Sequence, residues 1–272
     1  LGDGASGAPS HGSQVLQAPW CGSTREVQRI VDLISRAAQG HASPWRPWAP
    51  PLPTSLGAQE AVALGPATGP ADGLVLAATD HPQEQRLGHW RWSADQPLAV
   101  LGSPGSGRTT AALAAATSAL ESGLAVSLCL AGAVPPQLAA VPGTGLGTVV
   151  GPEDPRRLTR LWSLAAAGEL AGELVVVDDA DAMAAAVDEV LGPGEGQSIL
   201  ELLVRAAPAA GTGLVLTAPL AMAGSRWAAR IGLRLVLGAP QPAQAAVAGL
   251  PRGVVTGSSP GRGVIIDGAV EA

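Results

Sequence analysis

The feature that most constrains the fold is a glycine-rich loop between an apolar segment and an alanine-rich segment. Residues 98–101 read LAVL, residues 102–109 read GSPGSGRT, and residues 110–120 read TAALAAATSAL. This is a short buried-strand pattern, a G-x-x-x-x-G-R-T loop and a helix former in succession. The glycines allow the loop to turn its backbone N–H groups inward, and the following helix directs its positive end to the same point. We therefore predict a phosphate-binding loop.

One position departs from the usual pattern of such a loop. Arg108 stands where Lys is expected, and the chain contains no Lys at all. The guanidinium keeps the positive charge but is wider and planar, so it needs more room than an ammonium. Thr109 offers a hydroxyl to Mg²⁺. The residues that we expect to contact the phosphates are Gly102, Ser103, Pro104, Gly105, Ser106, Gly107, Arg108, Thr109 and Thr110.

Two carboxylates follow a second apolar run. Residues 173–179 read ELVVVDD, which is typical of a buried strand that ends in Asp178 and Asp179. With a phosphate loop upstream, we expect Asp178 to hold Mg²⁺ and Asp179 to stand where many ATPases place a Glu to activate water. Alternatively, the two residues, together with Asp181, only cap the next helix.

Further polar residues follow the later strand pattern GLVLTAP, residues 213–219. Thr217 is expected either to sense the terminal phosphate and orient water, or to be an ordinary residue at a strand end. Arginines are then frequent, and one of them is a candidate to reach a neighbouring subunit's nucleotide, although surface roles are expected for most. These arginines are Arg226, Arg230, Arg234, Arg252 and Arg262.

Strand and helix patterns alternate from Leu74 onward, with apolar runs such as LVLAAT and LAVSLCL between helical stretches. Such alternation indicates an α/β domain with a mainly parallel sheet. We predict a flexible lead-in over residues 1–14, an N-terminal extension over 15–60 that packs on the core, and a domain over 61–272. The extension contains a helix around 23–38 and a proline-rich strap over 43–53, with Trp45 and Trp48 as buried anchors.

Composition excludes several classes of protein. The net charge of −6 and the pI near 5.2 give no general attraction to nucleic acid. Cys21 and Cys129 lack metal-ligand or redox spacing, and we expect both to be reduced and to have a structural role. The uncharged stretch 124–151 contains prolines and glycines that would break a membrane-spanning helix, and no signal peptide is visible. The chain starts at Leu1 rather than Met, so we expect a segment of a longer polypeptide.

Several motifs in a fixed order resemble the FtsK/SpoIIIE-type ATPases, and most of all the ATPase modules of the EccC type in type VII secretion. The resemblance covers about residues 24–272. Its motifs are LAVLGSPGSGRTT, ELVVVDDAD, GLVLTAP, SRWAARIGLRLVLG and LPRGVVTGSSPGRGVII, preceded by WAPPLP and TDHPQEQR.

The resemblance implies a three-layer RecA-like core that uses ATP and Mg²⁺. It also implies partners: sister ATPase modules or further copies of the chain, with exported proteins as substrates and DNA as the less favoured one. The expected location is the cytoplasm, with tethering to the membrane through parts of the protein absent from this segment and no membrane contact of its own. Later modules of EccC-type proteins often have weakened motifs, which Arg108 and Asp179 match.

Two other functions stay open at this point. An active DNA-translocating motor would be expected to have a catalytic Lys and Glu and a basic channel loop, and none of these is apparent. A scaffold or substrate-recognition module without nucleotide is the other alternative, because Arg108 alone does not establish binding.

Overall fold

The computed structural model describes residues 22–40, 49–139 and 145–267. Contacts divide the chain into two compact units, Leu1–Pro47 and Trp48–Ala272. The lead-in, Cys21, Trp45 and Trp48 lie outside the described residues, and packing of residues 15–47 on the second unit stays a prediction. Of the described residues, no helix is long and apolar enough to cross a membrane.

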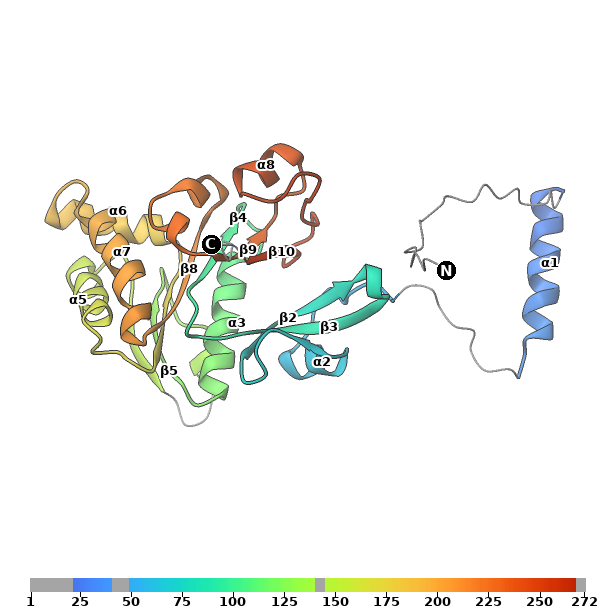
Figure 1. Ribbon diagram of the computed structural model, residues 1–272, viewed down its shortest axis with the longest axis horizontal. Helices are drawn as coiled ribbons and strands as arrows, with labels where there is room; N and C mark the ends of the chain where they lie inside the picture. Colours follow the sequence, from blue (N-terminus) through green and yellow to red (C-terminus); the bar gives the residue numbers. More distant parts are fainter. Residues whose placement is uncertain (1–21, 41–48, 140–144, 268–272) are drawn as a thin grey trace, which may run out of the picture. The chain divides into compact units, whose positions relative to one another are not determined.

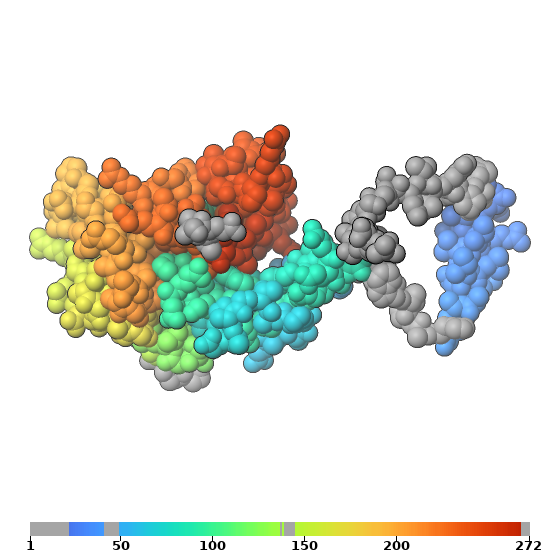
Figure 2. All heavy atoms as spheres, viewed as in Figure 1, coloured from blue at the N-terminus to red at the C-terminus, as the bar shows by residue number. Residues whose placement is uncertain are grey.

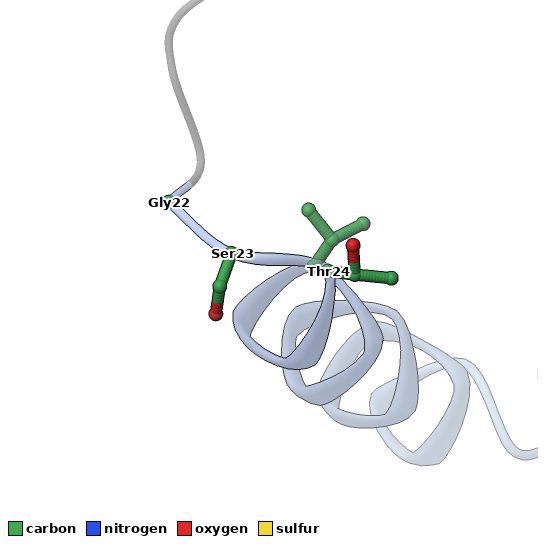
Figure 3. A pocket seen from close by; sticks show the side chains of 4 residues that line it. Gly22, Ser23 and Thr24 are labelled. Atoms are coloured by element: carbon green, nitrogen blue, oxygen red, sulfur yellow. The ribbon is translucent and has the colours of Figure 1, made fainter.

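The described part of the first unit contains helix α1, Thr24–Ala37, which confirms the predicted helix. Ser23 caps it: the Glu26 N–H donates to Ser23 Oγ at 3.4 Å, and the Ser23 N–H donates to Glu26 Oε2 at 2.8 Å. The apolar side chains Val27, Ile30, Val31, Leu33 and Ile34 are exposed. A shallow pocket lies at the start of the helix (Figure 3). It is lined by Gly22, Ser23, Thr24 and Val27, and none of these residues is ionisable.

The second unit is built on a sheet that has seven strands within the described residues, in the order β10-β9-β4-β8-β7-β5-β6. All neighbouring strands are parallel except β9 and β10, which are antiparallel. The mainly parallel α/β class is therefore confirmed. The strands are β4 (Leu98–Gly102), β5 (Ala125–Cys129), β6 (Leu146–Val150), β7 (Glu173–Val177), β8 (Gly213–Pro219), β9 (Leu233–Leu237) and β10 (Gly263–Asp267).

Helices cover both faces of this sheet, so the predicted three-layer arrangement is also confirmed (Figure 1). Alternate residues of β4 show it: Leu98 and Val100 share a core with α3, whereas Ala99 and Leu101 share one with the three helices α5–α7. Figure 2 shows the yellow-to-orange segment of these three helices at one end of the unit in this view. The helices of the unit are α2 (Ala58–Ala63), α3 (Arg108–Glu121), α4 (Pro136–Ala139), α5 (Pro155–Ala166), α6 (Ala180–Leu191), α7 (Glu195–Ala206) and α8 (Pro242–Val247).

A second, three-stranded sheet lies on the α3 side, in the order β1-β3-β2. Its strands are β1 (Ala67–Thr68), β2 (Leu74–His81) and β3 (Arg86–Trp92). The sequence pattern of LVLAAT placed residues 74–79 among the strands of the parallel sheet, which is wrong. The link from β2 to β3 is a single turn, Pro82–Glu84, and such a link joins only antiparallel strands because a parallel crossover needs a dozen or more residues.

The proline-rich strap is described from Ala49 onward and is neither helix nor strand up to Pro53. The Arg262 guanidinium donates to the carbonyl oxygens of Leu52 and Pro53. The strap is therefore hydrogen-bonded to its own domain at these residues. Trp90, Trp92 and Trp162 are all buried, as expected for core residues.

We expect the sheet that carries the site to depend on its central strands. Leu216 in β8 is fully buried, whereas Leu202 on α7 is 40% exposed. Leu216→Ala should lower the free energy of unfolding by about 2–5 kcal/mol, because the lost side chain leaves a cavity. Leu202→Ala should lower it by less than about 1 kcal/mol. Urea titrations followed by circular dichroism measure both changes, and equal losses would contradict the described core.

Candidate functional site

The glycine-rich loop connects β4 to α3. Gly102 is the last residue of β4, and Gly105 and Gly107 have left-handed φ values of 73° and 99°. A backbone N–H to carbonyl bond of 2.9 Å joins Ala111 to Gly107 at the start of the helix. The N–H groups of residues 108–110 have no acceptor within the helix, because they belong to its first turn. The loop thus presents free donors at the positive end of α3.

Two segments from late in the chain hold this loop. The Ser103 hydroxyl donates to the Gly238 carbonyl at 2.6 Å, at the end of β9. The Gly261 N–H donates to the Ser106 carbonyl at 2.8 Å, and within the loop the Ser106 N–H donates to the Ser103 carbonyl at 3.1 Å. Of the described residues, none offers a hydrogen-bond partner to the buried Ser106 hydroxyl.

Steric limits explain the glycines Gly102 and Gly238, but not Gly105. A Cβ at Gly102 would lie 2.3 Å from Ser106 Oγ and 2.9 Å from Arg108 Cγ. A Cβ at Gly238 would lie 2.6 Å from Ser106 Cβ, whereas a Cβ at Gly105 would meet nothing within 4 Å. The loop is therefore packed against β9 on one side and open to a ligand at Gly105 on the other.

Asp178 comes directly after β7, and its N–H donates to the Cys129 carbonyl at 2.9 Å. The Thr109 hydroxyl donates to Asp178 Oδ2 at 2.8 Å, so the structure brings these two residues together. Asp179 is the N-cap residue of α6, but its side chain makes no capping hydrogen bond. Its φ of 57° and ψ of 57° are unusual for a residue with a side chain.

Arg108 and Asp179 face each other across the site. Arg108 Nη1 lies 3.5 Å from Asp179 Oδ1, and the two side chains are 17% and 48% exposed. Partial burial raises the pKa of Asp179, the charges of Asp181 and Asp178 raise it further, and the Arg108 guanidinium opposes them. The negative charge of the site exceeds its positive charge, so the site favours an additional cation.

Thr217 makes two hydrogen bonds to the carboxylate residues. Its hydroxyl donates to Asp178 Oδ1 at 2.6 Å and accepts from the Asp179 N–H at 2.9 Å. The side chain is almost fully buried. Strand β8 places it there, because β8 lies between β4 and β7 in the sheet.

These groups have the chemistry that a magnesium nucleotide requires. Mg²⁺ prefers oxygen ligands and takes only one or two from the protein when phosphates and water supply the rest. The Thr109 hydroxyl and the Asp178 carboxylate suit that role, and Arg108 with the N–H groups of residues 108–110 suits the phosphates. Within the described residues, there is no group of three or more His, Cys, Asp or Glu that could hold a metal by itself.

The structure separates the candidate arginines into two sets. Arg234 donates to three carbonyl oxygens of residues 223–231, and Arg262 donates to the strap. Both guanidinium groups therefore have bonds within the chain. The exposed ones that stay available to a neighbouring molecule are Arg226, Arg230 and Arg252.

Sequence reasoning missed Gly238 and Gly261 as supports of the loop. The signal was available for Gly261, which lies in the sequence PGRG, residues 260–263, within the motif LPRGVVTGSSPGRGVII. Cys129 proves to be a core residue, since burial raises the pKa of its thiol to about 12 and keeps it protonated. Its expected structural role is confirmed.

Two solved structures illustrate how this fold is shared. The cytoplasmic domain of the type VII secretion ATPase EccC from Thermomonospora curvata matches with a TM-score of 0.58 and 19% identity, over 86% of this chain and 33% of that chain. EssC (ATPases 2 and 3) from Geobacillus thermodenitrificans matches with a TM-score of 0.55 and 17% identity, over 80% of this chain and 46% of that chain. No protein-family model and no curated protein matches the sequence. The chain thus spans less than half of either structure and has the fold of their ATPase domains.

The packing at Gly102 gives a direct test of the loop geometry. Gly102→Ala should lower the free energy of unfolding by about 1–3 kcal/mol, because the new methyl overlaps Ser106 and Arg108. Gly224→Ala is the matched control, since a Cβ there meets nothing within 4 Å, and it should change stability by less than about 1 kcal/mol. Urea titration of both variants measures the difference. If Gly102→Ala is as stable as the control, the loop does not pack as described.

Proposed function

We propose that this chain is a nucleotide-binding module of an FtsK/SpoIIIE-like, EccC-type ATPase, which binds ATP with Mg²⁺ and hydrolyses it slowly or not at all. The observation that carries the proposal is the meeting of the phosphate loop with Asp178 and Asp179 at one edge of the sheet. Thr109 and Asp178 are hydrogen-bonded there, and Arg108 lies beside Asp179. The likeness in fold to EccC and EssC supports the choice of family.

Phosphate binding would use the loop and the first turn of α3. Residues 102–110 supply the turn and the free N–H groups, and Arg108 supplies the positive charge. The guanidinium of Arg108 and the N-terminus of α3 both attract an anion. A triphosphate is large enough to accept hydrogen bonds from several of these N–H groups at once. Thr109 and Asp178 would hold Mg²⁺, which stabilises the negative charge of the phosphates.

Weak hydrolysis is proposed because of Arg108 and Asp179. A water-activating carboxylate must reach the attacking water, and Asp179 is one methylene shorter than Glu. In addition, its Oδ1 lies 3.5 Å from Arg108 Nη1, so the guanidinium competes with the attacking water for this carboxylate oxygen. The same arginine would also have to contact the phosphates, so the Arg108 guanidinium would have to bind both Asp179 and the nucleotide.

The wider role follows from the resemblance. EssC is described as carrying ATPases 2 and 3 within one chain, so we propose that the present module works beside sister modules. Exported proteins are then the proposed substrates, and DNA is the less favoured one. The proposed location is the cytoplasmic side of the membrane, with tethering through other parts of the protein.

Titration of the chain with ATP and Mg²⁺ by calorimetry tests the proposal. We expect binding with little phosphate release. Arg108→Ala should weaken ATP affinity about 10- to 100-fold, because it removes charge-assisted hydrogen bonds worth about 1.5–3 kcal/mol. Arg205→Ala, an exposed arginine in the last turn of α7, is the control and should bind like the wild type.

Three outcomes would contradict this proposal in different ways. Rapid phosphate release that double-stranded DNA stimulates would favour a DNA-translocating motor. No binding by the wild type would leave a scaffold or substrate-recognition module. Binding that Arg108→Ala does not weaken would show that nucleotide occupies another surface.

Replacing Arg108 and Asp179 by the residues usual in active ATPases should increase the rate of ATP hydrolysis. The double variant Arg108→Lys, Asp179→Glu should release phosphate at least about tenfold faster than the wild type, since a placed general base contributes about 10²–10⁴-fold. A coupled assay for free phosphate measures the rate. Adding Asp178→Asn to this variant should abolish the gain. A double variant that binds ATP normally but gains no rate would show that other features limit hydrolysis.

A further inference from the structure

Thr217 occupies a position from which it can set the geometry of both carboxylate residues. The last paired residues of β7 and β8 are Val177 and Leu216, so Thr217 stands beside the point at which β7 ends and Asp178 begins. On its other side, Thr217 pairs with Val100 of β4. Its side chain is 1% exposed.

The one proton of this hydroxyl is already donated. A threonine hydroxyl has one proton to donate and two lone pairs to accept with. The proton goes to Asp178 Oδ1 at 2.6 Å, which is the short range of a bond to an ionised carboxylate. A lone pair accepts from the Asp179 N–H at 2.9 Å. No proton is left to donate to a phosphate oxygen, so the geometry does not favour a phosphate sensor.

The two bonds act on different parts of the site. The bond to Oδ1 fixes the Asp178 carboxylate with its other oxygen, Oδ2, on the Thr109 hydroxyl at 2.8 Å. The bond from the Asp179 N–H holds a left-handed backbone that a residue with a side chain seldom adopts. In that conformation the Asp179 carboxylate lies beside Arg108.

We propose that Thr217 is a positioning residue that orients the Asp178 carboxylate and the Asp179 backbone for Mg²⁺, and that it does not read the terminal phosphate. This inference rests on the proposed function, because it requires that the site binds a magnesium nucleotide. It differs from an ordinary packing role because the hydroxyl, not the volume of the side chain, is what matters.

Thr217→Val and Thr217→Ser separate the hydroxyl from the volume. Valine has the shape of threonine but leaves Asp178 Oδ1 and the Asp179 N–H without their partner, whereas serine keeps the hydroxyl. Thr212→Val is the matched control: Thr212 is a buried threonine just before β8, and its hydroxyl has no hydrogen-bond partner among the described residues.

Calorimetry with the whole chain measures the ATP affinity, once in EDTA and once in Mg²⁺. Electron paramagnetic resonance measures Mn²⁺ binding directly, by titration of the ATP-bound protein. Thr217→Val should weaken Mn²⁺ binding, and the affinity gained with Mg²⁺, by at least about tenfold. Its ATP affinity in EDTA should stay within about twofold of the wild type. Thr217→Ser and Thr212→Val should behave like the wild type in both conditions.

Other results would overturn the inference in distinguishable ways. Unchanged metal binding in Thr217→Val overturns it alone, and so does an equal loss of ATP affinity in EDTA, which would indicate phosphate contact. Absence of ATP binding by the wild type overturns the proposed function, and this inference with it. Should Thr217→Val fail to fold, Thr217→Cys replaces it, because the thiol fills a similar volume but is a weak hydrogen-bond donor. It should show the same loss of metal binding.

Discussion

The position of β8 between β4 and β7 determines how the site is assembled. The phosphate loop follows β4 and the carboxylates follow β7, so the strand between them brings its own side chain to the middle of the site. Thr217 bonds there to both Asp178 and Asp179. The left-handed backbone of Asp179 costs about 1–3 kcal/mol in a residue other than glycine, and the bond from its N–H to Thr217 helps to offset that cost.

The loop itself depends on segments that lie far away in the sequence. Ser103 bonds to Gly238, and Gly261 bonds to Ser106. The next residue, Arg262, bonds to the carbonyls of the proline-rich strap. A continuous set of contacts therefore runs from the strap through residues 261–262 to the phosphate loop. The shape of the loop consequently depends on chain segments before and after the domain's central strands.

The net negative charge of the site favours the binding of a cation. Partial burial raises the pKa of Asp179, the charges of Asp181 and Asp178 raise it further, and the guanidinium of Arg108 only partly opposes them. A divalent cation would restore the balance, and a nucleotide would bring one with it. If Arg108 turned to the phosphates, Asp179 would lose its ion pair, so the substitution of Arg for Lys connects nucleotide binding with the state of the carboxylate.

The sequence by itself determined the α/β class, the glycine-rich loop between a strand and a helix, and the two carboxylates at a strand end. Each of these is a local pattern of strand, loop and helix whose residues are neighbours along the chain. The place of β2 was predicted wrongly, although its short link to β3 already required an antiparallel pair.

Only the tertiary structure decided which groups hold the site in shape. Thr217 bonds to the Asp179 N–H across 38 positions and to the Asp178 carboxylate across 39, and Ser103 bonds to Gly238 across 135. Such pairs follow from strand order and register, which sequence periodicity does not specify.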